Sequence, residues 1–225
     1  MVAFSGFGEA AFEFYEGLLA DNSRSYWTAR KSDYERHVRG PMGELCAELE
    51  DEFGPAKLFR PYRDVRFSKD KTPYKTHQGG ITPEGFYVQV DADGLMVAGG
   101  MYAPTTEQLH RYRAAVDEDL SGKELETIVD GLREEGLEIG GDRLKTRPRG
   151  TPPDHPRLDL LRHRSLYAHE GWPSDPWMAT SELVERVRVA WRRLRPLVEW
   201  GHTHIGPPTS PADPRLLPLT PGFPP

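Results

Sequence analysis

The chain has 225 residues, of which 37% are hydrophobic and 28% are charged, and its formal net charge is −6. A chain of this length can bury well over half of the surface that its unfolded state exposes, so the composition predicts a globular protein. The acidic balance disfavours a dedicated nucleic-acid binder. No segment approaches the ~18 consecutive apolar residues that span a bilayer, so we expect no membrane association.

The beginning of the chain, MVAFSGFGEAAFEFY, does not resemble a signal peptide. It has no basic region ahead of its apolar residues, and acidic residues interrupt them. The single cysteine, Cys46, excludes a disulfide within the chain and is expected to be a small buried side chain in a helix. We therefore expect a cytoplasmic protein.

The first quarter of the chain predicts helices, because its apolar residues recur at helical spacing. Asn22 or Ser23 can cap the second helix. Gly40-Pro41 is expected to break the helical pattern before the third. The expected helices cover Glu9–Ala20, the stretch through Trp27 to Tyr34, and Met42–Phe53.

After these helices, the residue pattern changes to one that predicts a β-sheet. From Phe59 to Ser68 the residues alternate, with Arg63 and Val65 on one face, which predicts a strand. Two more strands are expected at Gly85–Val90 and Gly94–Met101. The residues between them form a good hairpin turn. We expect one face of this sheet to be exposed.

The second half of the chain mixes helices with extended segments. A helix is expected after Ala103-Pro104-Thr105-Thr106, and Pro156 suits the first turn of a later one. The other expected elements are a helix at Gly122–Glu135, an extended segment at Leu137–Arg147, a loop at Pro148–Pro156, a helix to about Tyr167, and a long helix from Ser181 to about Trp200.

Helices followed by strands mixed with helices predict an α+β protein with an antiparallel or mixed sheet, a helical N-terminus and a long C-terminal helix. No linker interrupts the pattern, so we predict a single domain over residues 1–206. Residues 207–225 are Pro-rich and without periodicity, and we expect them to be a disordered tail.

The most concentrated chemical feature is a basic run from Arg60 to Lys75, which contains only two acidic residues, Asp64 and Asp70. Arginine forks bind carboxylate or phosphate with two hydrogen bonds, and lysine adds a mobile charge. Asp64 is expected to hold the guanidinium of Arg66. The alternative is a solvated loop whose cations pair with surface acids.

A second basic segment precedes the expected helix at Pro156. Lys145 and Arg147 alternate on an extended stretch and are expected to project from one face. Asp154 can cap the helix, and His155 titrates near neutral pH. The alternative is a capping aspartate beside an ordinary surface histidine.

These motifs resemble a bacterial family of conserved hypothetical proteins called domain of unknown function 2461. The resemblance covers about Phe4 to Trp200 and rests on three motifs. They are RDVRFSKDKTPYKTH, the N-terminal set Asn22, Arg24, Trp27, Lys31 and Tyr34, and KTRPRGTPPDHP at 145–156. The resemblance implies no activity, but it adds Asn22, Arg24, Trp27 and Tyr34 as candidate rim or orienting groups.

The first functional hypothesis is a binding or catalytic site for a small phosphorylated or carboxylated molecule, formed by the segments 60–75 and 145–155. If the protein is an enzyme, His155 or Asp64 is the candidate acid–base group. The candidate ligand-binding residues are Arg63, Arg66, Lys69, Lys71, Lys75, Lys145, Arg147, Asn22, Arg24, Trp27 and Tyr34.

Two alternatives stay open. The same basic face could be an interaction module for nucleic acid or an acidic protein, or its cations could satisfy a polar network in the fold. No cofactor or metal is predicted, because the eight histidines are scattered and no phosphate-binding glycine motif is present. The sequence specifies neither a reaction nor an oligomeric state.

Overall fold

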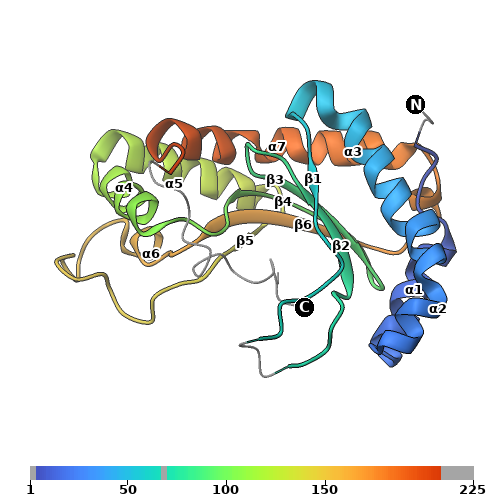
Figure 1. Ribbon diagram of the computed structural model, residues 1–225. Helices are drawn as coiled ribbons and strands as arrows, with labels where there is room; N and C mark the ends of the chain where they lie inside the picture. The colour runs from blue at the N-terminus through green and yellow to red at the C-terminus, as the bar shows by residue number, and fades with distance from the viewer. Residues whose placement is uncertain (1–3, 67–69, 209–225) are drawn as a thin grey trace. The chain divides into compact units, whose positions relative to one another are not determined.

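The structure is a computed structural model, and it describes residues 4–66 and 70–208 (Figure 1). The elements in chain order are α1 (Glu9–Ala20), α2 (Arg24–Tyr34), the π-helix η1 (Glu35–Arg39), α3 (Gly40–Phe53), β1 (Lys57–Leu58), β2 (His77–Ile81), β3 (Phe86–Asp91), β4 (Gly94–Met101), α4 (Thr106–Asp117), α5 (Asp119–Glu134), β5 (Glu138–Gly140), α6 (Leu158–Leu161), β6 (Leu166–Pro173), the 3₁₀-helix η2 (Pro176–Ala179) and α7 (Glu182–His204).

The strands form a six-stranded sheet in the order β1-β2-β3-β4-β6-β5. The ladders β1–β2, β2–β3 and β5–β6 are antiparallel. Helices precede the sheet and a long helix ends the described chain. The predicted α+β class, with its antiparallel sheet, helical N-terminus and long C-terminal helix, is confirmed.

The chain forms two compact units. The first unit comprises Met1–Val97 and Gly171–Arg192, and the second comprises Ala98–Glu170 and Arg193–Pro225. Elements β4, β6 and α7 therefore contribute residues to both units. The single domain over 1–206 stays a prediction, and most of the expected tail lies outside the described residues.

The first unit has an aromatic core on one face of the sheet. Trp191 of α7 is completely buried, and its indole Nε1 donates to the carbonyl of Tyr87 at 3.0 Å. The rings of Phe53 and Phe86 pack against it at 5.1 and 5.6 Å between centroids. Large buried aromatic side chains contribute much of the hydrophobic stabilisation of a core.

The expected helix break at Gly40-Pro41 is wrong. In a regular α-helix the ring of Pro41 would clash with the carbonyl of His37, four residues earlier. The π-helix η1 widens the turn there, and the N–H of Gly40 donates to the carbonyl of Glu35, five residues back. The helical path therefore runs from α2 through η1 into α3 without interruption.

The second unit packs α4 and α5 against the end of α7. Thr105 and Gln108 form a capping box at the start of α4, which fixes where this helix begins. The hydroxyl of Tyr112 donates to the carbonyl of Leu160 at 2.7 Å, and the indole of Trp200 donates to the carbonyl of Ser121 at 3.0 Å. The polar groups of these two buried aromatic side chains thus form hydrogen bonds with backbone carbonyls.

The expected helix from Pro156 to Tyr167 is mostly wrong, because it shortens to the single turn of α6. The following residues form β6, in which Tyr167 pairs with Gly140 of β5. The side chain of Tyr167 lies where a side chain at Gly140 would be. A larger residue at position 140 would therefore prevent this pairing of β5 with β6.

Strand β2 escaped the sequence analysis because Gly79 and Gly80 weaken the strand pattern. The phenol of Tyr87 on β3 covers Gly79 and takes the place of its missing side chain. The expected exposed face of this sheet is also wrong for β3, since Tyr87 and Gln89 are only 3% and 8% exposed. Their polar atoms bond to each other along the strand, because the Tyr87 hydroxyl donates to Gln89 Oε1 at 2.8 Å.

Candidate functional site

The described residues of the basic run, 60–66 and 70–75, lie between β1 and β2 and do not form the expected strand (Figure 1). The run is closed at its base by a short antiparallel bridge between Tyr62 and Tyr74. Pro61 and Pro73, which precede the two bridged residues, have no backbone N–H to donate, so the strand pairing does not extend further. The flanking hydrogen bonds join Arg63 N to Pro73 O at 2.9 Å and Lys75 N to Pro61 O at 2.8 Å.

Asn22 clamps the base of this loop. Its Oδ1 accepts from the N–H of Tyr74 and its Nδ2 donates to the carbonyl of the same residue, both at 3.0 Å. Ser23, and not Asn22, caps α2. The ring of Tyr74 also stacks on Trp27, with centroids 4.4 Å apart and planes 11° apart. The loop base is thereby fixed to the N-terminal helices.

Trp27 and Tyr34, two of the candidate rim or orienting groups, are buried. The hydroxyl of Tyr34 donates to Gln78 Oε1 on β2. The Nε1 of Trp27 is buried without a hydrogen-bond partner in the described chain. Arg24, by contrast, is exposed. A direct part of these residues in ligand binding stays a prediction.

Two of the loop cations are paired within the loop. Arg66 Nε donates to both carboxylate oxygens of Asp64, at 2.9 and 3.1 Å, which confirms the expected hold of Asp64 on this guanidinium. Arg63 binds Asp70 and Thr72. The Arg66 contact lowers the pKa of Asp64 to about 2, which suits an ion-pair partner better than a base near neutral pH.

The remaining loop lysines differ in their surroundings. Lys71 is exposed and its Nζ donates to the carbonyl of Val65 at 2.9 Å. Lys69, with Phe67 and Ser68, lies outside the described residues. Lys75, at the loop base, is only 8% exposed.

Lys75 is a buried cation without an anionic partner in the described part of the chain. Its Nζ lies 4.9 Å from the centre of the Phe59 ring. Burial lowers the pKa of Lys75, and the nearby positive charge of Arg60 lowers it further. Arg60 itself is exposed. The loop base therefore carries cationic character that its own acids do not neutralise.

His77, two residues further on in β2, was missed by the sequence analysis. Burial, followed by the positive charges of Lys75 and Arg63, lowers its pKa to about 4, so the ring is neutral at pH 7. Its Nε2 is buried without a hydrogen-bond partner within residues 4–66 and 70–208. The only sequence signal for this residue was its place directly after the basic run.

The second basic segment belongs to the second unit. Lys145 and Arg147 are exposed and lie after the end of β5 at Gly140. The guanidinium of Arg162 holds this segment by donating to the carbonyls of Leu144 and Lys145, at 2.9 and 3.1 Å. Since the two basic segments lie in different units, their joint site stays a prediction.

His155 is built into the junction between α4 and α5. Its Nδ1 accepts from the N–H of Arg157 at 3.1 Å, so the neutral ring carries its proton on Nε2 and donates to Asp117 Oδ1 at 3.0 Å. Asp154 is not a cap as expected, because Arg157 occupies the N-cap position of α6. These contacts give His155 a structural role.

Arg157, which the sequence analysis did not select, anchors the same junction. It is 3% exposed and donates to the carbonyls of Val116 and Asp117, at 2.7 and 3.0 Å, and to Asp119 Oδ1 at 3.0 Å. A cation at the C-terminal end of α4 satisfies the carbonyls that have no partner in the helix. The Asp-His-Pro motif thus leads into a clamp on the α4–α5 turn.

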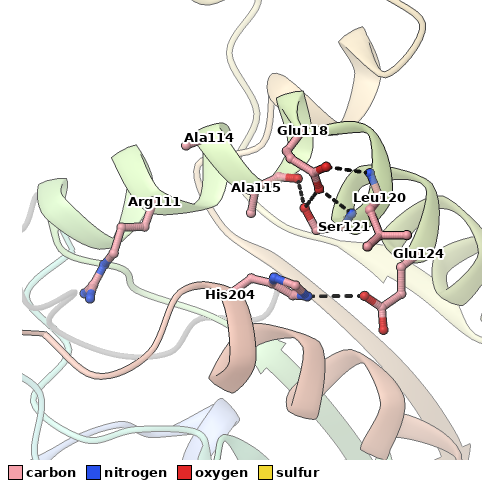
Figure 2. A pocket seen from close by; sticks show the side chains of 8 residues that line it. All are labelled: Arg111, Ala114, Ala115, Glu118, Leu120, Ser121, Glu124 and His204. Carbon is pink, nitrogen blue, oxygen red and sulfur yellow. Dashed lines mark hydrogen bonds and ion pairs between the residues drawn. The ribbon is translucent and has the colours of Figure 1, made fainter.

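The second unit has an open cavity of about 420 Å³. Figure 2 shows the side chains that line it. The polar groups of this cavity are largely engaged with one another. Glu118 accepts from the backbone of Leu120 and Ser121, and these bonds lower its pKa to about 2. His204 pairs with Glu124 at 3.2 Å. The described residues contain no cluster of side chains suited to hold a metal ion.

The fold and the site define an α+β protein with an antiparallel sheet and a basic loop closed between two of its strands. The chain belongs to the family of conserved hypothetical proteins DUF2461, whose model matches residues 10–200. No curated protein and no solved structure matches it. Within the described residues, no helix is long and apolar enough to cross a membrane.

Proposed function

We propose that the protein binds a small phosphorylated or carboxylated molecule at the base of the basic loop, with Lys75 as the central cation. The observation behind this proposal is that Lys75 is only 8% exposed and that no carboxylate of the described chain pairs with it. Holding an unpaired charge away from water costs free energy. A bound anion offsets this cost, so an anionic ligand should bind beside Lys75 more tightly than a neutral one.

The neighbours of Lys75 support an anionic ligand. Arg60 is close enough to lower the pKa of Lys75, and it offers a guanidinium fork for carboxylate or phosphate. Arg63 and Arg66 are held by acids and shape the loop.

The same pairing favours a small ligand over the alternative, a surface for nucleic acid or an acidic protein. Affinity for a polyanion depends on many free cations spread over a face. Here the guanidinium groups of Arg63 and Arg66 already face Asp70 and Asp64. Lys75 differs from these two arginines because it is buried and has no carboxylate partner in the described chain.

A thermal-shift screen at low ionic strength tests the proposal. The probes are inorganic phosphate, nucleotides, sugar phosphates and small 2-oxo acids. We expect at least one to stabilise the wild type, by about 2.7 kcal/mol at a concentration of about 100 times its Kd. Lys75→Met should abolish the shift and still fold, because it removes an unpaired buried charge.

Lys57→Met is the matched control, since Lys57 carries the same charge on neighbouring β1 but is exposed. It should respond to the anion as the wild type does. The proposal is wrong if no anion stabilises the wild type, or if Lys75→Met keeps the full shift.

The contribution of the second basic segment is tested separately with Lys145→Ala/Arg147→Ala. Both side chains are exposed, so the double variant should fold normally. A weaker affinity for the same anion would support the two-segment site. An unchanged affinity would show that the site belongs to the first unit alone.

A further inference from the structure

The neutral amine is the nucleophilic form of a lysine side chain. Two surroundings favour the neutral amine: burial away from water and a second cation nearby. Lys75 has both, since it is 8% exposed and Arg60 lies close by. An ion pair with a carboxylate would oppose this effect, and no carboxylate of the described chain pairs with it.

The other lysines of the described chain lack this combination. Lys71 is exposed and donates to a backbone carbonyl, and Lys123 lies 3.8 Å from the carboxylate of Asp119. Lys31, Lys57 and Lys145 are exposed.

The side chains around Lys75 are suited to a ligand that has an anionic end and a reactive carbonyl group. The Phe59 ring lies 4.9 Å from Nζ and excludes water on that side. Arg60 can hold a carboxylate or phosphate.

We propose that Lys75 is a carbonyl-reactive lysine that forms an imine with an aldehyde or ketone bearing a carboxylate or phosphate. This inference rests on the proposed anion site and names its ligand class. The ammonium first loses a proton to water. The Nζ lone pair then attacks the carbonyl carbon, and the C=O π pair moves to oxygen.

Proton transfer from nitrogen to this oxygen gives a carbinolamine. The lone pair on nitrogen then expels the hydroxyl group as water once water has supplied a proton. The product is a protonated imine, and one water molecule is released for each C=N bond formed. No oxidant or reductant takes part.

Reductive trapping tests the inference. The full chain is incubated with pyridoxal 5′-phosphate, an aldehyde that carries a phosphate, and the hydride donor sodium cyanoborohydride reduces any imine to a stable secondary amine. Peptide mapping by mass spectrometry then locates the adduct. We expect Lys75 to be labelled ahead of the exposed lysines, although an ordinary buried amine would be labelled last.

Three controls sharpen the test. Lys75→Arg keeps the positive charge but cannot form an imine, so it should lose the adduct and keep the thermal shift with inorganic phosphate. Lys57→Arg should leave the labelling of Lys75 intact. Inorganic phosphate in excess should slow the labelling of Lys75 but not that of Lys57.

The outcomes separate the two proposals. Stabilisation by inorganic phosphate without selective labelling of Lys75 would overturn the imine and leave the anion site standing. Selective labelling that phosphate does not slow, with no thermal shift, would keep the reactive lysine and reject the anion site. Labelling spread evenly over the exposed lysines, with no thermal shift, would reject both.

Discussion

Replacing His77 with glutamine should make the protein less sensitive to acid. The pKa of this ring falls from 6.5 to about 4 in the folded state. Above pH 6.5 both the folded and unfolded states are neutral here, so His77 adds no pH dependence. Between pH 6.5 and about 4 the unfolded state binds a proton that the folded state does not, so stability falls with falling pH.

The size of the effect follows from the shift. Each pKa unit corresponds to about 1.4 kcal/mol. The lowered pKa of His77 therefore reduces the unfolding free energy by about 3 kcal/mol when the pH has fallen from 6.5 to about 4. The measurement is urea unfolding at several pH values from about 7 to about 4.5, for the wild type and His77→Gln. The variant should lose less stability over this range.

Comparing the two proteins isolates His77. Burial also lowers the pKa of His163 and His169, and these residues contribute equally to both proteins. His110→Gln, at an exposed position, controls for the loss of any histidine. An identical pH slope in the wild type and His77→Gln would refute the burial of a neutral ring at this position.

Three further predictions concern structural residues. Asn22→Ala should lower the unfolding free energy by about 2 kcal/mol because it removes both bonds to Tyr74, whereas Asn22→Asp should cost less because it keeps the acceptor; urea unfolding measures both. Arg157→Met should cost about 3 kcal/mol in the same assay, and a loss no larger than that of exposed Arg164→Met would contradict its anchoring role. Burial raises the pKa of Cys46 to about 12, so iodoacetamide should alkylate it only in denaturant, and rapid alkylation of the native chain at about pH 8 would contradict this.

Local sequence patterns correctly predicted the helices and strands that have a clear apolar periodicity of their own. The apolar period predicted α1 at its observed bounds, and the alternation with a turn predicted β3 and β4. The prediction failed where a distant residue decides the local structure. Gly79 and Gly140 look like strand breakers until Tyr87 and Tyr167 cover them.

The candidate site shows the same limit. The sequence correctly indicated that 60–75 concentrates charge, and it correctly paired Asp64 with Arg66. It did not indicate that Arg63 would be held by Asp70. This contact forms because the chain folds back on itself as a loop, and the predicted strand would have kept the two residues apart. Nor did the sequence distinguish buried Lys75 from exposed Lys71, since burial depends on the ring of Phe59 and on the strands beneath.

The wide turn in the long N-terminal helix has a consequence for how related sequences can vary in length. Tyr34, Val38 and Met42 are all buried at a spacing of four residues. In a regular helix of 3.6 residues per turn, two such steps overshoot the starting face by about 80°. The π-helix η1 absorbs this excess, so that Leu45 and Leu49 still reach the core. A family member that lacks one residue between 35 and 39 would not need the wide turn, because the deletion removes about 100° of rotation and a regular α-helix then keeps the downstream apolar positions facing the core.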